Sequence, residues 1–238
     1  MKKYFTKRNV LFVIIFAVLG FLALQIPFTE LAGSGAKFTI YDAFAPIAGS
    51  FIGAVPGLIA VLLMELANFF MHGAVVSDAG TIIRFLPMLF AVAYFARKGK
   101  FNIIIPIIAI IAWNLNPVGR SVWYYSMFWT IPIFAYFLRD KFLLARSFGA
   151  TFTAHAVGGA LWIWFFNLPA AVWIALIPVT AIERTIFALG ISASFVVVGN
   201  ALAYLEKKHI VNLGFLAEKK YILPSLRYES NAQNTNNA

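Results

Sequence analysis

The stretch YDAFAPIAGSFIGAVPGLIAVLLMELANFFMHGAVVSD, residues 41–78, decides how the rest of the chain is interpreted. It is apolar over almost its whole length, and it is too long for one simple membrane helix. Pro46 and Pro56 interrupt it, and a proline inside a helix removes a backbone hydrogen bond. We therefore predict two membrane helices, over residues 42–52 and 56–72.

Small residues recur every four positions through the turn that we expect near Gly53–Pro56. They are Ala45, Gly49, Gly53 and Gly57. This spacing places small side chains on one helical face, where another backbone can approach closely. The row predicts either a packing surface within the bundle or a docking surface for a partner.

The second predicted helix carries a stripe of polar residues. Glu65, Asn68 and His72 are spaced three and four positions apart, so they share one helical face. Polar groups inside a bilayer are costly, and such a stripe is therefore a functional-site hypothesis. A hydrogen-bonded seam between helices would leave the same pattern, so both interpretations stay open.

The composition indicates a polytopic membrane protein with an all-α fold. The chain has 238 residues, of which 62% are hydrophobic and 12% charged, whereas soluble domains carry about 25% charged residues. Several apolar runs approach the roughly 20 residues that cross a bilayer. The absence of cysteine excludes disulfides, thiol catalysis and thiolate metal sites.

We predict a transmembrane helix bundle of six to eight membrane segments within residues 1–215. Residues 216–238 form a cytoplasmic tail, whose polar end is expected to be disordered. The first segment is expected to be an uncleaved helix, because no clean cleavage site follows it. The segments beyond the opening stretch are residues 10–28, 79–96, 101–115, 121–138, 145–166 and 170–205.

Basic residues set the expected orientation. If eight segments cross with the N-terminus inside, the cytoplasmic ends carry 12 basic residues: Lys2, Lys3, Lys7, Arg8, Arg97, Lys98, Lys100, Arg139, Lys141, Arg146, Lys207 and Lys208. The opposite loops carry Lys37 and Arg120. This asymmetry follows the positive-inside rule and predicts a multi-pass protein of the cell membrane with both termini inside. The net charge of +10 is therefore a topology signal, and no nucleic-acid partner is expected.

Few sequence motifs indicate a reaction. The chain has no Walker-type phosphate loop, HExxH or GxSxG. His72, His155 and Glu65 could together bind a metal, but membrane histidines more often hydrogen-bond across helices, so we predict no metal and no cofactor. Arg84 fits equally an anionic ligand or a structural partner. Glu183 and Arg184 are expected to find partners on other helices, because adjacent helical side chains diverge.

Residues 38–98 resemble the membrane-embedded substrate-binding subunits, or S components, of energy-coupling factor transporters. The resemblance rests on Asp42 at a helix start, the small-residue helix, the turn GAVPG (53–57), the polar stripe, and a fourth helix that ends in basic residues. The later motif TAHAVGGALWIW (153–164) is similar to that family's final hairpin. Because S components usually have six membrane helices, residues 101–141 look like an inserted hairpin.

The resemblance implies a binding subunit for a vitamin-like small organic solute, with partner subunits for membrane coupling and for ATP hydrolysis. The loop TELAGSGAKFTI (29–40) would cover an outward-facing cavity as a lid. The family often has alanines four apart on the first helix for docking; these are missing here, so the small-residue row is the alternative docking surface. The predicted solute-binding residues are Asn68, His72, Arg84, Asn114, Arg120, Tyr125, His155 and Trp162.

Two other functions stay open. A membrane-embedded enzyme acting on a lipid or isoprenoid would use Glu65, His72 and His155 for acid–base work. A scaffold protein would use its polar seams only for structure. Taken singly, tryptophans also fit the aromatic belt at a membrane interface better than a site. This applies to Trp123, Trp129, Trp162, Trp164 and Trp173.

Overall fold

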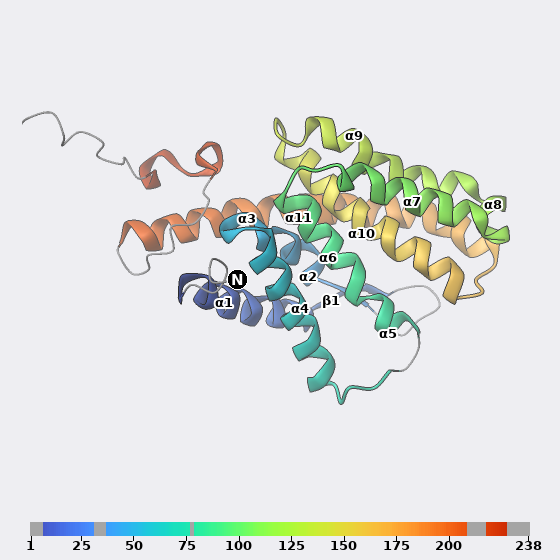
Figure 1. The fold of residues 1–238 in the computed structure, drawn as a ribbon, viewed down its shortest axis with the longest axis horizontal. Helices are drawn as coiled ribbons and strands as arrows, with labels where there is room; N and C mark the ends of the chain where they lie inside the picture. Colours follow the sequence, from blue (N-terminus) through green and yellow to red (C-terminus); the bar gives the residue numbers. More distant parts are fainter. Residues whose placement is uncertain (1–6, 31–36, 77–78, 209–217, 228–238) are drawn as a thin grey trace, which may run out of the picture.

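The structure is a computed structural model that describes residues 7–30, 37–76, 79–208 and 218–227 (Figure 1). It is mostly helical, which agrees with the predicted helical bundle, and one short β-hairpin is added to it. Several predicted features lie outside the described residues. These are Lys2, Lys3, most of the loop between residues 29 and 40, Asp78, and the polar end of the tail.

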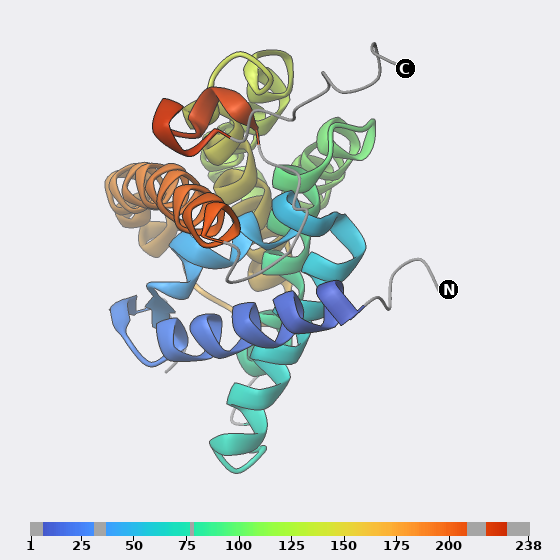
Figure 2. The same cartoon turned by 90° about the vertical axis from the view of Figure 1, so that its left-hand side faces the viewer.

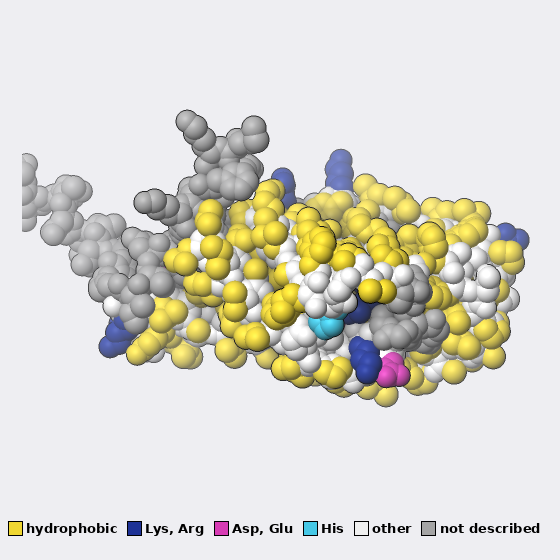
Figure 3. All heavy atoms as spheres, turned by 90° about the horizontal axis from the view of Figure 1, so that it is seen from below, with side chains coloured by type: hydrophobic (Ala, Val, Ile, Leu, Met, Phe, Trp, Pro, Cys, Tyr) yellow, Lys and Arg dark blue, Asp and Glu magenta, His cyan; other side chains and the backbone are white. Residues whose placement is uncertain are grey.

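The described residues contain three helical stretches that are long and apolar enough to cross a membrane. They are Ala54–Met71, Ala79–Ala96 and Ala170–Lys207. Two shorter apolar helices, Val10–Leu24 and Phe101–Leu115, accompany them. Many of their apolar side chains point outward, including Ile14, Val18 and Leu22 on one face of the first helix. Hydrophobic side chains cover much of the face that Figure 3 shows.

The described residues of the N-terminal half form seven α-helices, one 3-10 helix and the hairpin. They are α1 (Lys7–Leu24), β1 (Pro27–Glu30), β2 (Lys37–Thr39), α2 (Tyr41–Phe44), η1 (Ala45–Ala48), α3 (Gly49–Ile52), α4 (Ala54–Met71), α5 (Ala79–Ile83), α6 (Phe85–Ala96) and α7 (Phe101–Leu115). Strands β1 and β2 pair antiparallel, with Glu30 opposite Lys37. They flank the predicted lid loop.

The C-terminal half is organised around one buried helix. Its elements are α8 (Pro117–Ser121), η2 (Trp123–Thr130), α9 (Ile131–Leu138), α10 (Leu143–Phe165), α11 (Ala170–Lys207), η3 (Lys219–Tyr221) and η4 (Pro224–Leu226). Helix α10 packs against α6, α7, α9 and α11, so it lies at the centre of the bundle. Its small residues permit this, since Gly149 and Gly159 face the rings of Tyr94 and Trp129 at close range.

The predicted helix over residues 42–52 is divided into α2, η1 and α3. Pro46 lies within η1, where its missing N–H suits the tighter turn. Gly53 ends α3 with a positive φ of 107°, a conformation that costs side-chain-bearing residues energy. The predicted turn therefore exists, and the long α4 follows it directly.

The small-residue row is a packing surface inside this chain. Ala45 and Gly49 are buried, and a methyl group added to Gly57 would lie 2.3 Å from the Cα atom of Gly49. Because Gly49 itself faces Ala96 on α6, the row joins three segments of the same bundle. The alternative interpretation as an exposed docking surface is therefore wrong.

The predicted helix over residues 121–138 begins as the eight-residue 3-10 helix η2. This tighter spiral is longer than most 3-10 segments. It turns Tyr125 and Trp129 inward, and both are buried. Trp162 and Trp173 are also buried, so the aromatic-belt interpretation is wrong for these three tryptophans. Trp123 and Trp164 are more than half exposed and remain compatible with it.

Basic residues predicted at inner ends gather at one end of the bundle. Arg139 donates hydrogen bonds from its guanidinium to the carbonyl oxygens of Tyr94, Phe95 and Arg97, and Arg146 donates to that of Phe95. These are carbonyls that the end of α6 leaves without helical partners. Arg146 also pairs with Glu218. The two buried arginines therefore close the end of α6.

The described part of the predicted tail, residues 218–227, packs against the bundle. Asn200 of α11 donates to the carbonyl of Tyr221 at 2.9 Å and accepts from the backbone N–H of Leu223 at 2.8 Å. Figure 2, which views α11 nearly along its axis, shows this segment lying over the helix. These residues belong structurally to the bundle.

Candidate solute-binding cavity

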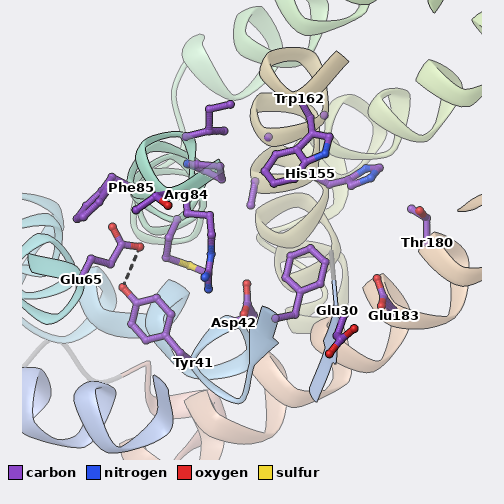
Figure 4. Close-up of a pocket in the computed structure, with 18 of the residues that line it drawn as sticks. Glu30, Tyr41, Asp42, Glu65, Arg84, Phe85, His155, Trp162, Thr180 and Glu183 are labelled. Atoms are coloured by element: carbon purple, nitrogen blue, oxygen red, sulfur yellow. Dashed lines mark hydrogen bonds between the residues drawn. The ribbon is translucent and has the colours of Figure 1, made fainter. Parts of the chain in front are cut away.

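A cavity of about 410 Å³ lies between the hairpin and the helices α2, α4, α5, α6, α10 and α11 (Figure 4). Its volume falls within the range of small-molecule sites. Apolar and aromatic side chains form much of the wall, and polar groups enter it from several elements. This mixture is typical of pockets that bind and orient an organic molecule.

Six of the eight predicted binding residues line the cavity. They are Asn68, His72, Arg84, Tyr125, His155 and Trp162. Asn114 and Arg120 do not. Asn114 donates to Ile110 and Ser126, and Arg120 donates to the carbonyl of Asn114. Asn114 lies in the last turn of α7 and Arg120 lies in α8, and neither is among the residues that line the cavity.

The polar stripe of α4 faces the cavity along its whole length. Glu65, Asn68 and His72 all line it. Asn68 accepts a hydrogen bond from Gln25 at 2.9 Å, which ties α4 to the end of α1. His72 contacts the carbonyl of Asn68 through Nδ1 at 2.8 Å. Because a carbonyl oxygen only accepts, Nδ1 must carry the proton and donate it in this contact. In the neutral ring, Nε2 is then an acceptor.

Glu65 is the deepest group of the stripe. The hydroxyl of Tyr41 lies 3.3 Å from Glu65 Oε1 and donates to it, and a second contact of 3.4 Å joins that hydroxyl to the carbonyl of Val61. Glu65 Oε2 has no hydrogen-bond partner among the described residues, although it is shielded from solvent. A buried carboxyl oxygen without a donor is costly, and such a group calls for an explanation.

Arg84 connects the cavity wall to the hairpin. It lies at the junction of α5 and α6, and its Nη2 donates to the carbonyl of Lys37 on β2 at 2.6 Å. In Figure 4 its guanidinium points towards Asp42 on the opposite wall. Arg84 therefore has a structural partner and also lines the cavity.

Glu183 and Arg184 of α11 have separate partners, as we expected, but the partner of Glu183 lies on a strand and not on another helix. Glu183 accepts from the hydroxyl of Thr29 on β1. Arg184 lies over the ring of Phe38 on β2, with 4.3 Å between its guanidinium carbon and the ring centroid, and its Nη1 is 3.5 Å from Thr151 Oγ1. Both side chains are buried, and together they fasten the hairpin to α11.

His155 is the centre of a hydrogen-bond chain between helices. The indole of Trp129 donates to Nδ1 at 3.0 Å, so we infer that the proton of the neutral ring is on Nε2. Nε2 then donates to the hydroxyl of Tyr125 at 3.2 Å, and that hydroxyl donates to Thr180 at 3.0 Å. Both ring nitrogens are occupied, which leaves no lone pair for a metal.

The aromatic wall is fixed by ring stacking. Tyr125 stacks on Trp113 with centroids 5.1 Å apart, and Trp162 stacks on Phe166 at 4.2 Å. Trp173 lines the cavity as well, and its indole N–H has no acceptor among the described residues. Such packed rings present a rigid surface to a planar solute. Within the described residues, no cluster of histidine and acidic side chains is arranged to bind a metal ion.

Several cavity residues were not predicted as binding residues. Tyr41, Asp42, Thr180 and Glu183 line the cavity. Asp42 and Glu183 were visible in the sequence as acids within apolar segments, which is the signal that could have identified them. Tyr41 and Thr180 gave no comparable signal, because single tyrosines and threonines are common in such helices.

The chain is similar to an archaeal protein over most of its length. An uncharacterized protein of Methanocaldococcus jannaschii is similar to this chain, with 27% identity over 237 residues that cover 90% of this chain and 79% of that protein. No family model matches the chain, and no solved structure matches it. The similarity extends over most of both chains and carries no functional description.

Proposed function

We propose that this chain is the substrate-specific binding subunit of an importer of the energy-coupling factor type. It holds a small, vitamin-like organic solute in the cavity beneath the β1–β2 hairpin. Separate partner subunits supply membrane coupling and ATP hydrolysis. The proposal rests on the family resemblance described above and on one structural observation, which is the cavity of about 410 Å³.

The character of the cavity favours binding over chemistry. Its polar groups converge from five or more separate elements, and rigid aromatic rings fill the space between them. The enzyme alternative needs His155 for proton transfer, but both nitrogens of that ring are already hydrogen-bonded to neighbouring side chains. A binding subunit needs only a cavity that fits the solute, polar groups that orient it, and an entrance to the cavity.

The hairpin supports the idea of a lid. Its two strands lie at the cavity, and each is held by a side chain from a different wall: Arg84 contacts β2, and Glu183 contacts β1. Opening would exchange these hydrogen bonds for water at roughly 0.5–1.5 kcal/mol each, and it would also separate the rings of Phe28 and Phe38 from Phe187 of α11.

The bundle is proposed to cross the cell membrane in six to eight segments, with both termini inside. The outward-facing apolar side chains and the basic cluster at one end support this arrangement. The cavity then lies towards the outer face, on the side of His72. Residues 101–141 form the pair of segments that the resemblance leaves unaccounted for.

The decisive experiment is mass spectrometry of small molecules that co-purify with the detergent-solubilised protein. We expect one solute in near-stoichiometric amount, and the Trp162→Ala variant is expected to retain less of it. A matched control is Trp164→Ala, because Trp164 lies on the same helix but points outward. Equal solute loss in both variants, or turnover of the bound molecule into a product, would contradict the proposal.

A further inference from the structure

The charges around the cavity identify the kind of solute that it accepts. The arginines of the wall are both engaged with strand β2: Arg84 donates to a backbone carbonyl, and Arg184 lies over the ring of Phe38. Asp42 and Glu183 are near enough to Arg184 to offset its charge. Neither guanidinium is therefore a simple receptor for an anionic solute.

Carboxyl groups outnumber the arginines in the wall. They belong to Glu30, Asp42, Glu65 and Glu183. Three of these acids already have partners: Glu30 pairs with Lys37 at 3.3 Å, Asp42 accepts from the N–H of Thr39 at 2.9 Å, and Glu183 accepts from Thr29. Glu65 differs, because its Oε2 has no donor among the described residues.

Aromatic rings adjoin this carboxyl group. Phe69 follows Glu65 by four positions and so lies on the same face of α4. Phe85 meets Phe69 edge-on, with centroids 5.8 Å apart, and all three residues line the cavity. Figure 4 shows Phe85 and Glu65 on the same side of it. Ring faces beside a carboxylate are a favourable setting for a positively charged nitrogen.

We propose that Glu65 is the recognition group of the cavity and that it accepts an N–H donor from a cationic nitrogen of the solute. The solute class is thus an organic cation, an amine or an amidine carried on a ring. Tyr41 donates to Oε1, and an N–H of the bound cation supplies the hydrogen bond that Oε2 lacks. This inference rests on the proposed function and specifies its substrate.

The test uses three probes of one shape and different charge: benzamidine, benzoate and benzyl alcohol. Binding to the full-length purified protein is measured by tryptophan fluorescence and by the rise in unfolding temperature. We expect benzamidine to bind and benzoate to bind at least tenfold more weakly. Glu65→Gln is expected to weaken benzamidine binding at least tenfold, whereas the control Asp140→Asn, which removes an exposed carboxylate outside the cavity, changes it less than twofold.

Three results would overturn the inference. They are absence of benzamidine binding, benzoate binding of equal strength, and unchanged benzamidine binding by Glu65→Gln. The proposed function is judged separately, by the co-purified solute: a retained solute without a nitrogen donor overturns only the present inference. If no solute is retained and no probe binds, the binding function itself fails.

A measurement on the unaltered protein covers the case in which Glu65→Gln does not fold. Dicyclohexylcarbodiimide, an apolar reagent, labels carboxyl groups in apolar surroundings such as this cavity, and peptide mass spectrometry locates the label. Benzamidine is expected to protect Glu65 at least fivefold, and benzoate is expected to leave its labelling unchanged. Protection that is equal for the two probes would contradict a role for Glu65 in recognising the cation.

Discussion

The close approach of Gly57 to Gly49 makes a quantitative prediction for the replacement Gly57→Ala. The added methyl group would lie 2.3 Å from a backbone Cα atom, whereas ordinary contacts begin at 3.4 Å. The two segments must therefore separate by about 1 Å, and backbone cannot move aside as a flexible side chain can. Overpacking of this kind costs about 2–3 kcal/mol, from which the better helix propensity of alanine recovers up to about 1 kcal/mol.

The expected outcome is a net loss of about 1–2 kcal/mol in the free energy of unfolding. Unfolding is measured by tryptophan fluorescence during titration with sodium dodecyl sulfate in mixed micelles. The control is Gly199→Ala on α11, where a methyl group would meet Ile222 at an ordinary 3.5 Å. That variant is expected to be as stable as the original protein or slightly more so. If the two variants are equally stable, the α3–α4 packing described above is incorrect.

Three further predictions concern the ends of the bundle. Arg146→Met removes buried hydrogen bonds to the end of α6 and should lower the free energy of unfolding by about 2–3 kcal/mol, measured in the same titration; an unchanged midpoint would contradict the capping role. The hydrogen bond from Lys98 lowers the pKa of the Asp140 carboxyl group, so this pair stabilises the fold above the unfolded pKa of about 3.9 and loses its effect as the pH falls through the folded value. Because the pair is exposed and screened, Asp140→Asn should cost less than about 1 kcal/mol near pH 6, and the cost should decrease as the pH falls below about 3.9; a constant difference would refute the linkage. Since the chain has no cysteine, Ser121→Cys and Lys141→Cys are unique labelling sites, and we expect an impermeant maleimide to label the first in intact cells and the second only after lysis. The reverse pattern would invert the proposed topology.

Long periodic segments could be predicted from the sequence because their apolar runs are uninterrupted. The helix over residues 101–115 has the predicted bounds. Helix α10 begins two residues earlier and ends one residue earlier than predicted, and α11 begins as predicted and ends two residues later. The hairpin could not be predicted, because β1 and β2 have only four and three residues and their pairing depends on contacts with α11. The subdivision of residues 41–52 depended on how Pro46 and Gly53 pack, which a pattern of residue types does not contain.

The candidate site was predictable where polar residues follow helical spacing. Glu65, Asn68 and His72 share a face by geometry alone, and the structure brings that face to the cavity. Asn114 and Arg120 shared only an expected depth in the membrane, and depth does not determine the direction of a side chain. Carbonyl oxygens of α7 accept their hydrogen bonds instead.

Helix α11 is long enough for a small tilt near the cavity to move its far end by several ångströms. Its 38 residues span about 57 Å at 1.5 Å per residue, whereas a bilayer interior is about 30 Å thick. Pro178 interrupts its hydrogen bonding next to the cavity residues Val179 and Thr180. A pivot there with an arm of roughly 40 Å to the far end would convert a 10° tilt into a displacement of about 7 Å. If α11 crosses the membrane as proposed, binding of a solute in the cavity would thus change the position of the far end of α11 at the opposite membrane face.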